Sequence, residues 1–396
     1  MSTIIYLIRH AEAEGNVYRR CHGIYDALLT EKAWVQLPYL AKRFENVELD
    51  AVYASHLYRA RHTAKAIAEK KGMKVTLRKN LHEIDMGDWE DYPWAELGVR
   101  FPNEFELWRS RPWDCKIPSG ETVTEAGDRV LADLHKIAKQ HEGGQVAVVS
   151  HGSAIRSILC RVLKLEPEQV GEIGWGDNTC VAKLIFEDCE VKAEYWNDAS
   201  HLPEELSTFA AIGWKDNKGM PTTVQVWFRP YNPDDKNDNE LLLNFIREQY
   251  KCAYGTTQKL DENEKLLKAR KSSEILSRAV SFAMLDNKPV ALVFLDAANE
   301  QNAGMVGCYC IDKEYRGHGI AQQLIGQSMS VYRSLCKDFI FANAGENNQR
   351  AIGFYKKFGF EQVGITENEC GKHFLMRKSI KVPTISEESQ WFEIET

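Results

Sequence analysis

The chain has 396 residues, 44% of them hydrophobic and 27% charged, with a formal net charge of -7 at pH 7. This length exceeds what one hydrophobic core usually organises, so two domains are expected. The negative charge argues against a nucleic-acid-binding surface, which needs a basic stripe. No stretch approaches the roughly 20 apolar residues that cross a bilayer, and the first residues are too short an apolar run for a secretion signal.

Ten cysteines are scattered along the chain without a Cys-x-x-Cys pair. This usage is typical of reduced, buried thiols in a cytoplasmic protein and not of disulfides or zinc ligands. We therefore expect a cytoplasmic protein whose partners include neither a membrane nor a nucleic acid.

The first part of the chain alternates short apolar runs with helical stretches. The expected strands are 3–8, 51–54, 145–149, 179–186 and 191–196, and the expected helices are 57–71 and about 153–164. Strand–helix alternation is typical of a parallel α/β sheet. The last two strands lie close enough in sequence to form a hairpin.

The periodic pattern stops over 199–221, where prolines and glycines predict a linker. A second α/β pattern follows. Its expected strands are 222–228, 290–296, 304–311, 338–342 and 373–379, and its expected helices are 239–251, 320–335 and 348–358. We therefore expect one domain over 1–198, a second over 222–380, and a poorly ordered acidic tail over 381–396.

Two histidines directly follow predicted strands. His10 lies at the carboxyl end of strand 3–8, and His151 lies at the carboxyl end of strand 145–149. In an open parallel sheet the carboxyl ends of the strands meet at the crevice where ligands bind. We therefore expect both imidazoles to face one site.

The neighbouring residue types suit phosphoryl transfer. Arg9 and Arg59 supply the positive charge that a phosphoryl group needs, and Gly152 opens a helix whose amides favour an anion. A histidine nucleophile must be neutral, and nearby cations lower its pKa. The leaving oxygen needs a proton, for which Glu83 is the candidate. No metal-ligand pattern accompanies these groups, so arginine and imidazole would carry the charge compensation.

Several segments carry a family resemblance in the right order: Arg9-His10-Ala11-Glu12 with Asn16, Asp26 to Thr30, Ser55 to Ala64, Glu83 to Glu90, Gly120-Glu121-Thr122, and Ser150-His151-Gly152. With them, residues 1–198 resemble the histidine phosphatase superfamily, which has the phosphoglycerate mutase-like fold. The resemblance implies an α/β/α sandwich in which His10 accepts the phosphoryl group and Glu83 donates a proton. It also implies that the phosphoryl group is held by Arg9, Asn16, Arg59, His151 and Gly152.

The chain departs from the family pattern at three places. Ala11 replaces the usual glycine, His56 replaces the usual proline, and Asp91 replaces the usual glycine after Trp-Glu. None of these changes removes a catalytic atom. The segment 87–90 resembles the phosphatase branch more than the mutases, which favours hydrolysis. The alternative is a phosphomutase, in which His10 would return its phosphoryl group to the product.

Aromatic residues gather in the segment that would cover this site: Trp89, Tyr92, Trp94, Trp108 and Trp113. Their apolar surface suits the packing of a lid onto the sheet, which we favour. It also suits an aromatic moiety on the substrate.

A second motif lies after strand 304–311, where Arg316 to Ala321 (Arg-Gly-His-Gly-Ile-Ala) opens a helix. Glycine lets the backbone approach a ligand, and amides at a helix start bind pyrophosphate. Asn348 and Tyr355 lie seven residues apart, so they share one helix face at two turns. The spacings of the Rossmann and Walker fingerprints are absent.

With these motifs, residues 222–380 resemble the GNAT N-acetyltransferase fold, which has a mixed sheet. By that resemblance acetyl-CoA is the co-substrate, and Tyr355 protonates the departing thiolate and contacts the cofactor. The other cofactor-binding residues implied are Ile311, Arg316, Gly317, Gly319, Ile320, Ala321 and Asn348. The group that deprotonates the amine stays open between Glu300, Asp296 and an ordered water.

The two domains together indicate a bifunctional enzyme that hydrolyses a small-molecule phosphate ester and acetylates a small-molecule amine. The fusion favours one pathway, or one metabolite that carries both groups, such as an amino sugar phosphate. The alternative is a non-catalytic acetyl-CoA-binding domain that regulates the phosphatase.

Overall fold

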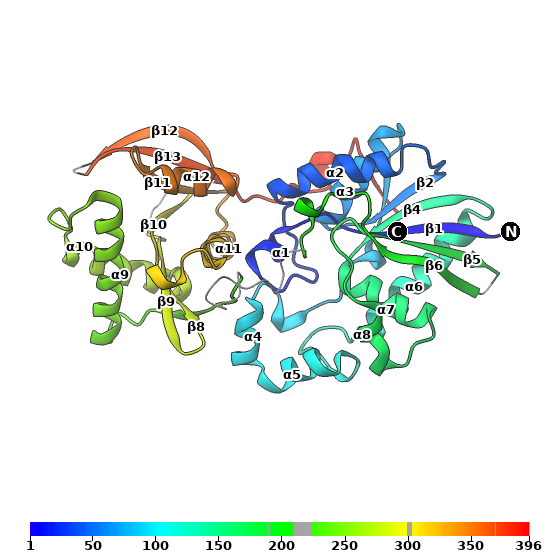
Figure 1. The fold of residues 1–396 in the computed structure, drawn as a ribbon, viewed down its shortest axis with the longest axis horizontal. Helices are drawn as coiled ribbons and strands as arrows, with labels where there is room; N and C mark the ends of the chain where they lie inside the picture. Colours follow the sequence, from blue (N-terminus) through cyan, green and yellow to red (C-terminus); the bar gives the residue numbers. More distant parts are fainter. Residues whose placement is uncertain (189, 210–222, 299–302, 369, 396) are drawn as a thin grey trace.

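The computed structural model describes residues 1–188, 190–209, 223–298, 303–368 and 370–395. The chain forms two α/β domains that lie side by side, each built on a seven-stranded sheet (Figure 1). In each domain, helices cover both faces of the sheet. No helix in these ranges is long and apolar enough to span a membrane.

The first sheet has the order β14-β3-β2-β4-β1-β5-β6. Its strands are β1 (Thr3–Arg9), β2 (Ala51–Ser55), β3 (Val75–Arg78), β4 (Gln145–Ser150), β5 (Val181–Glu187), β6 (Glu190–Asp198) and β14 (Phe392–Ile394). The strands from β14 to β1 run parallel, and β5 is antiparallel to β1. The expected hairpin of the last two strands is present as β5 and β6.

Helices cover both faces of this sheet. One buried cluster joins apolar residues of α2 (Glu31–Arg43) and α3 (Tyr58–Lys70) to the strands. A second cluster joins α6 (Val123–Gln140) and α7 (Gly152–Val162) to the opposite face. The sandwich expected from the sequence is therefore present. The shorter helices are α1 (Glu14–Tyr18), α4 (Trp94–Arg100), α5 (Pro102–Ser110) and α8 (Val170–Ile173).

The second sheet has the order β12-β13-β11-β10-β9-β8-β7. Its strands are β7 (Trp227–Pro230), β8 (Val280–Leu285), β9 (Lys288–Asp296), β10 (Ala303–Ile311), β11 (Phe339–Gly345), β12 (Glu361–Asn368) and β13 (Gly371–Ser379). Helices α9 (Lys236–Tyr254) and α10 (Glu262–Ile275) cover one face, and α11 (Ile320–Ser334) and α12 (Gln349–Lys357) cover the other. The sheet is mixed, as the resemblance implied, because only β10 and β11 pair in parallel.

β10 and β11 pair only over their first four residues and then separate. The register ends at Val306 opposite Ala342, and a bulge in β10 follows immediately, between Val306 and Cys308. A bulge bends its strand and increases the local twist. The separation opens a gap between the two strands at their carboxyl ends, where a ligand can enter the sheet.

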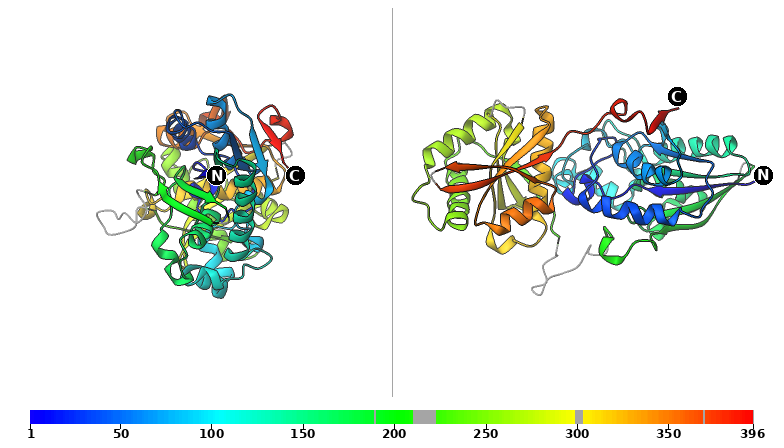
Figure 2. Two further views of the ribbon diagram at one scale, coloured as in Figure 1. Left: turned by 90° about the vertical axis from the view of Figure 1, so that its right-hand side faces the viewer. Right: turned by 90° about the horizontal axis from the view of Figure 1, so that it is seen from above.

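The expectation of a poorly ordered tail over 381–396 is wrong for the described residues. β14 pairs with β3 at the edge of the first sheet, so the chain returns from the second domain to the first (Figures 1 and 2). Phe392 is only 4% exposed and joins the cluster under α3. The prediction rested on the acidic composition of the tail and did not take account of Phe392, an apolar side chain that suits a buried edge strand.

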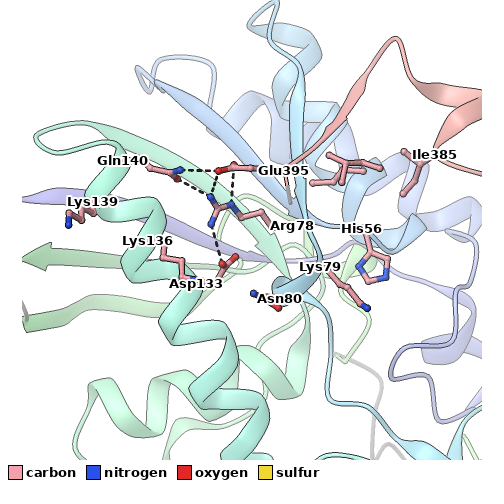
Figure 3. A pocket seen from close by; sticks show the side chains of 12 residues that line it. His56, Arg78, Lys79, Asn80, Asp133, Lys136, Lys139, Gln140, Ile385 and Glu395 are labelled. Atoms are coloured by element: carbon pink, nitrogen blue, oxygen red, sulfur yellow. Dashed lines mark hydrogen bonds and ion pairs between the residues drawn. The ribbon is translucent and has the colours of Figure 1, made fainter.

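Arg78 fastens the returning segment to the first domain (Figure 3). Its guanidinium donates hydrogen bonds to Glu395, to Gln140 over 3.0 Å and to Asp133 over 3.1 Å. Two carboxylates therefore neutralise one partly buried cation, and one of them comes from the end of the chain. The hollow beside this cluster, bordered by Lys136 and Lys139, is a cavity of about 1030 Å³.

The expected linker over 199–221 belongs in part to the first domain. Thr208 donates a hydrogen bond to Glu12 over 3.0 Å, and Gln36 donates to the Leu206 carbonyl over 2.8 Å. Residues 210–222 lie outside the described ranges.

The two domains touch through α1 and α11. A side chain at Gly326 would place its Cβ 2.5 Å from the Cβ of Tyr18, so only glycine allows this approach. Arg333 of α11 forms a bidentate pair with Glu14 of α1, at 2.6 and 3.0 Å. The contact is tight and charged, and it lies between two helices that each border a candidate site.

Candidate functional sites

The first candidate site is a cavity of about 650 Å³ at the carboxyl ends of β1 and β4. It is lined by the predicted residues Arg9, His10, Asn16, Arg59, Glu83 and Gly152. The ring of His151 stands beside that of His10, with their centroids 5.2 Å apart. All the residues predicted for phosphate binding thus come together in and around one cavity.

His10 is buried, and its neutral ring carries the proton on Nδ1. Its Nδ1 lies 2.7 Å from the Ala11 carbonyl oxygen and must donate to it, which leaves the lone pair of the neutral ring on Nε2. Burial, together with the positive charges of Arg59 and Arg9, lowers the pKa of His10 well below its ordinary value. The imidazole is therefore neutral near pH 7, as a nucleophile must be.

Two neighbours of His10 bury polar atoms that have no partner. Neither ring nitrogen of His151 makes a hydrogen bond, although its side chain is fully buried. The Nε of Arg9 is also buried and unpaired. Because buried polar groups are nearly always satisfied, such atoms on two residues next to His10 suit a site where a ligand supplies the missing partners. An anion with several oxygens suits them.

Arg59 and Asn16 are held in place by backbone groups. The Arg59 guanidinium donates to the carbonyls of Tyr25 and Gly23 over 2.9 and 2.6 Å. The Asn16 side-chain oxygen accepts from the Ala13 amide over 2.9 Å. These bonds fix both side chains before a ligand arrives, which reduces the entropy lost on binding.

Glu83 occupies the helix terminus that the sequence assigned to an anionic ligand. Its carboxylate accepts hydrogen bonds from the amides of Ser153 and Ala154 at the start of α7, over 3.0 and 2.8 Å. A third bond comes from the amide of Ile84 over 2.9 Å. The helix amides therefore position Glu83, and Gly152 is the member of that turn that lines the cavity.

The cavity is also lined by residues that sequence reasoning missed. They are Arg19, Arg20, His22, Trp175, Phe209 and Gln225. Two consecutive arginines shortly after Asn16 were a usable signal, whereas nothing in the sequence places Gln225, from the start of the second domain, in this cavity. Of the aromatic segment, Trp89 is fully buried by packing, while Trp94 and Trp108 line the cavity.

Asp91, where the family has glycine, connects the cavity wall to the second domain. It has a left-handed backbone, with φ at 60°, which explains why glycine is usual there. Its carboxylate accepts from Arg20 over 2.7 Å, from His22 over 3.1 Å and from Ser330 of α11 over 2.5 Å. The departure therefore serves the contact between the two domains.

The second candidate site is a cavity of about 430 Å³ between the separated ends of β10 and β11. Five of the predicted cofactor residues line it: Ile311, Arg316, Ala321, Asn348 and Tyr355. Gly317, Gly319 and Ile320 do not. The Ile320 side chain is 1% exposed and packs into the domain core, so only its backbone can serve a ligand.

The glycines of this loop have a conformational role. Gly317 and Gly319 have φ at 90° and 72°, in the left-handed region that side chains disfavour. They turn the chain into α11, whose first amides have no partner within the helix. Arg316 donates to the Ile311 carbonyl over 2.9 Å and lies 3.5 Å from Glu248. The loop is thus a helix start beside a cation, which suits an anionic ligand.

Tyr355 and Asn348 take different roles on α12. Burial raises the pKa of Tyr355 above its ordinary value, so the phenol keeps its proton. Asn348 is the residue before the helix, and its oxygen accepts from the Ala351 amide over 3.1 Å. Asn348 therefore caps the helix as well as lining the cavity.

Sequence reasoning also missed Tyr254 and the buried His373 to which it is hydrogen-bonded. Tyr254, at the end of α9, lines the second cavity and donates to Nε2 of His373 over 2.9 Å. Nδ1 of His373 donates to the Gly371 carbonyl over 2.9 Å, which fixes this tautomer. Of the earlier base candidates, Asp296 does not line the cavity, and Glu300 lies outside the described residues.

Comparisons with known proteins agree with both halves of this description. Residues 5–199 match the histidine phosphatase superfamily (branch 1), and residues 241–360 match the acetyltransferase (GNAT) family. Phosphoserine phosphatase 1 of Hydrogenobacter thermophilus is 30% identical over 200 residues, which cover 50% of this chain and 94% of that protein.

Two further similarities cover the same half of the chain. A probable phosphoglycerate mutase, GpmB, of Salmonella choleraesuis is 29% identical over 213 residues, covering 50% of this chain and 94% of that protein. The solved structure of Bacillus stearothermophilus YhfR is 29% identical, covers 50% of this chain and 98% of its own, and has a TM-score of 0.49. The chain therefore belongs to the histidine phosphatase superfamily through its amino-terminal domain, and it carries a GNAT acetyltransferase domain in its carboxy-terminal half.

Proposed function

We propose that the chain is a bifunctional enzyme that hydrolyses phosphomonoesters through a phosphohistidine and transfers acetyl groups from acetyl-CoA to a small-molecule amine. The observation that carries the first activity is the buried group of unpaired polar atoms around the neutral His10. His151 and Arg9 together have three such atoms, the ring centroid of His151 lies 5.2 Å from that of His10, and Arg9 lines the same cavity as His10. An ester phosphate would accept hydrogen bonds from Arg9 Nε and from the protonated ring nitrogen of His151, and it would stand where Nε2 of His10 can attack it.

The hydrolysis takes two steps. Nε2 of His10 forms a bond to phosphorus while the bond from phosphorus to the ester oxygen breaks, and the Glu83 carboxyl group gives that oxygen its proton. Water then attacks the phosphohistidine, passes a proton to Glu83 and releases inorganic phosphate. The arginines and His151 stabilise the charge on the equatorial oxygens in both steps.

Hydrolysis is favoured over the mutase alternative. The segment 87–90 resembles the phosphatase branch, and a phosphoserine phosphatase is among the relatives at 30% identity. The similarity to a probable phosphoglycerate mutase keeps the mutase reaction as the second candidate. Release of inorganic phosphate from a phosphomonoester separates the two reactions.

The second cavity suits acetyl-CoA. Its residues fit the cofactor because a helix start with left-handed glycines stands beside Arg316, and because the gap between β10 and β11 admits an extended chain. Acetyl-CoA supplies an activated acetyl group. Tyr355 would give its proton to the thiolate that leaves.

Tyr254 and His373 are the proposed route for the amine proton. The pKa of Tyr254 is raised to about 12, chiefly by burial, so the phenol works as a relay and not as a free base. It takes the amine proton while it passes its own proton to Nε2 of His373. This pair replaces Asp296 and Glu300 as the proposed base.

A trapping experiment tests the phosphatase proposal. Purified protein is mixed with a 32P-labelled phosphomonoester and quenched in alkali, in which phosphohistidine survives. Label on the peptide that contains His10, and no label in the His10→Ala variant, is the expected result. Turnover without any labelled protein would contradict the phosphohistidine mechanism. For the second activity, labelled acetyl-CoA and an amine panel should yield an acetylated product.

A further inference from the structure

Arg19 has a strained backbone conformation at the edge of the phosphatase cavity. It is the capping residue directly after α1, with φ at 57° and ψ at 43°. This left-handed region is free of steric penalty only for glycine. Strain of this kind persists where the surrounding structure imposes it, and it concentrates at binding sites.

Backbone hydrogen bonds on both sides of Arg19 impose this conformation. The amide of Arg20 donates to the Gly15 carbonyl over 3.1 Å, and the amide of Cys21 donates to the Tyr92 carbonyl over 2.8 Å. The carbonyl of Arg19 accepts from the Trp94 amide over 3.0 Å. The segment is therefore clamped between α1 and the aromatic wall of the cavity.

The guanidinium of Arg19 has no partner in the described part of the chain. Four arginines line the cavity, and the other three are engaged: Arg9 with the Gly176 carbonyl, Arg20 with Asp91, and Arg59 with two carbonyls. Arg19 is partly buried, and burial lowers its pKa. A cation that is partly withdrawn from water without a counter-charge is costly, and a bound anion would remove that cost.

The acidic group that acts on Arg19, Glu12, does not pair with it. Glu12 acts on Arg19 electrostatically but makes no hydrogen bond or ion pair with it. Its two carboxylate oxygens accept from Thr30 over 2.8 Å and from Thr208 over 3.0 Å. Glu12 is thus used by the domain's own structure.

The phosphoryl group that reacts does not need Arg19 either. It has His10, Arg9 and Arg59, which come from the end of β1 and from α3, whereas Arg19 follows α1 and its carbonyl accepts from the amide of Trp94, which also lines the cavity. The unpaired guanidinium is therefore available to a part of the substrate other than the phosphorus under attack.

We propose that the phosphatase site selects phosphomonoesters that carry a second anionic group, a carboxylate or a second phosphate, and that Arg19 binds it. Arginine suits this role because its planar fork donates two parallel hydrogen bonds to either anion. The inference rests on the proposed phosphatase function. Arg19 is the specificity-determining residue in it.

Matched substrate pairs test the proposal on the full-length protein. Phosphoserine against phosphoethanolamine isolates a carboxylate, and glucose 1,6-bisphosphate against glucose 6-phosphate isolates a second phosphate. The wild-type protein should prefer the doubly anionic member of at least one pair by ten-fold or more in kcat/KM. In Arg19→Gln that ratio should fall at least ten-fold, mainly through a higher KM, because the contact is remote from the reacting phosphorus.

Two variants control for folding and for charge. Arg19→Gly removes the side chain and relieves the left-handed strain, so it should melt at or above the wild-type temperature while it loses the preference like Arg19→Gln. Arg111→Gln removes an exposed arginine and should keep the preference. Loss of equal factors on both members of every pair in Arg19→Gln, or no preference in the wild-type protein, would overturn the proposal.

Binding measurements separate this proposal from the phosphatase proposal. In a His10→Ala background, where no turnover is expected, calorimetry with the same compounds should show that Arg19→Gln weakens the doubly anionic ligand ten-fold or more. This result would uphold the role of Arg19 even if phosphate release failed. Equal affinities for both members of each pair would refute that role even if the enzyme were an active phosphatase.

Discussion

Asp91 of the first domain and Ser330 of helix α11 in the second share a hydrogen bond of 2.5 Å. The same carboxylate pairs with Arg20, which lines the phosphatase cavity and also donates to Gln327 of α11 over 3.2 Å. One wall of the phosphatase site is therefore built on the acetyltransferase domain.

Replacing Asp91 with asparagine should destabilise the contact between the domains in a pH-dependent way. Burial alone would raise the pKa of Asp91, but Arg20 and hydrogen bonds from His22 and Ser330 hold it below its ordinary value. The stabilisation is therefore present above about pH 4 and is lost as the pH falls through the lower, folded-state pKa. At pH 7, urea unfolding should show a loss of about 1–3 kcal/mol in Asp91→Asn.

Urea unfolding of the same two proteins at pH 3 tests the pH dependence. The difference between wild type and Asp91→Asn should shrink there, because pH 3 lies below the ordinary pKa of an aspartate and the unfolded wild-type chain takes up a proton that the folded carboxylate does not. Asp88→Asn is the matched control, since Asp88 is exposed and lies three residues away. A gap that stays constant from pH 7 to pH 3 would argue against the charged contact.

The rate of the phosphatase should be insensitive to His10 protonation near neutrality. Burial first, and then Arg59 and Arg9, lower the pKa of His10. A histidine with the ordinary pKa near 6.5 would be roughly three-quarters protonated at pH 6 and would cost about four-fold in rate. We expect kcat/KM, corrected for ionisation of the substrate phosphate, to change less than two-fold between pH 8 and pH 6. A four-fold fall with a midpoint near 6.5 would contradict a depressed pKa.

Glu83→Gln should separate substrates by the basicity of the leaving oxygen. Alkyl phosphates need a proton on that oxygen and should lose about 10²–10⁴-fold in kcat, whereas 4-nitrophenyl phosphate should lose less than ten-fold. The measurement is kcat on both esters. A melting curve checks α7, whose first amides donate hydrogen bonds to Glu83. Equal losses on the two esters would rule out the acid role.

Acetyl-CoA should stabilise the protein, and Tyr355 should be needed for transfer but not for binding. At about 100 times Kd the ligand should add about 2.7 kcal/mol to the free energy of unfolding. Tyr355→Phe should keep this shift, because the ring stays in place, and should lose about 10²-fold or more in acetyl transfer. Calorimetric melts and release of the CoA thiol with the panel amine measure the two effects. Transfer at the wild-type rate in Tyr355→Phe would remove the tyrosine from the chemistry.

The returning strand β14 should stabilise the first domain through one side chain. Phe392→Ala removes a buried ring and should cost about 3–5 kcal/mol. Glu393→Ala changes the exposed neighbour in the same strand and should stay within about 0.5 kcal/mol of the wild type. Both are read from urea unfolding. Similar costs for the two variants would mean that the burial of Phe392 contributes little.

The sequence predicted the parts of the fold and of the site that depend on local pattern. His10 and His151 could be placed together because each directly follows an apolar run, and the ends of parallel strands converge. The start of a helix directly after Gly319 was indicated by the same local logic. These features need only a few consecutive residues to define them.

Features that depend on distant residues could not be read in this way. The role of Asp91 depends on Ser330, 239 positions away. The helix start at Gly152 looked available for an anion, yet Glu83 from another loop occupies its amides. In both cases the local pattern was correct, and a partner from elsewhere in the chain decided what it does.

β14 also determines the order in which the molecule can be completed. A ribosome makes the first domain's helices and six of its seven strands, then the entire second sheet, and only afterwards the strand that covers the edge at β3. Until then that edge exposes unpaired backbone groups on which a stray strand could add. The synthesis of β14, and not that of residue 198, is therefore the step after which the first domain can attain its native sheet.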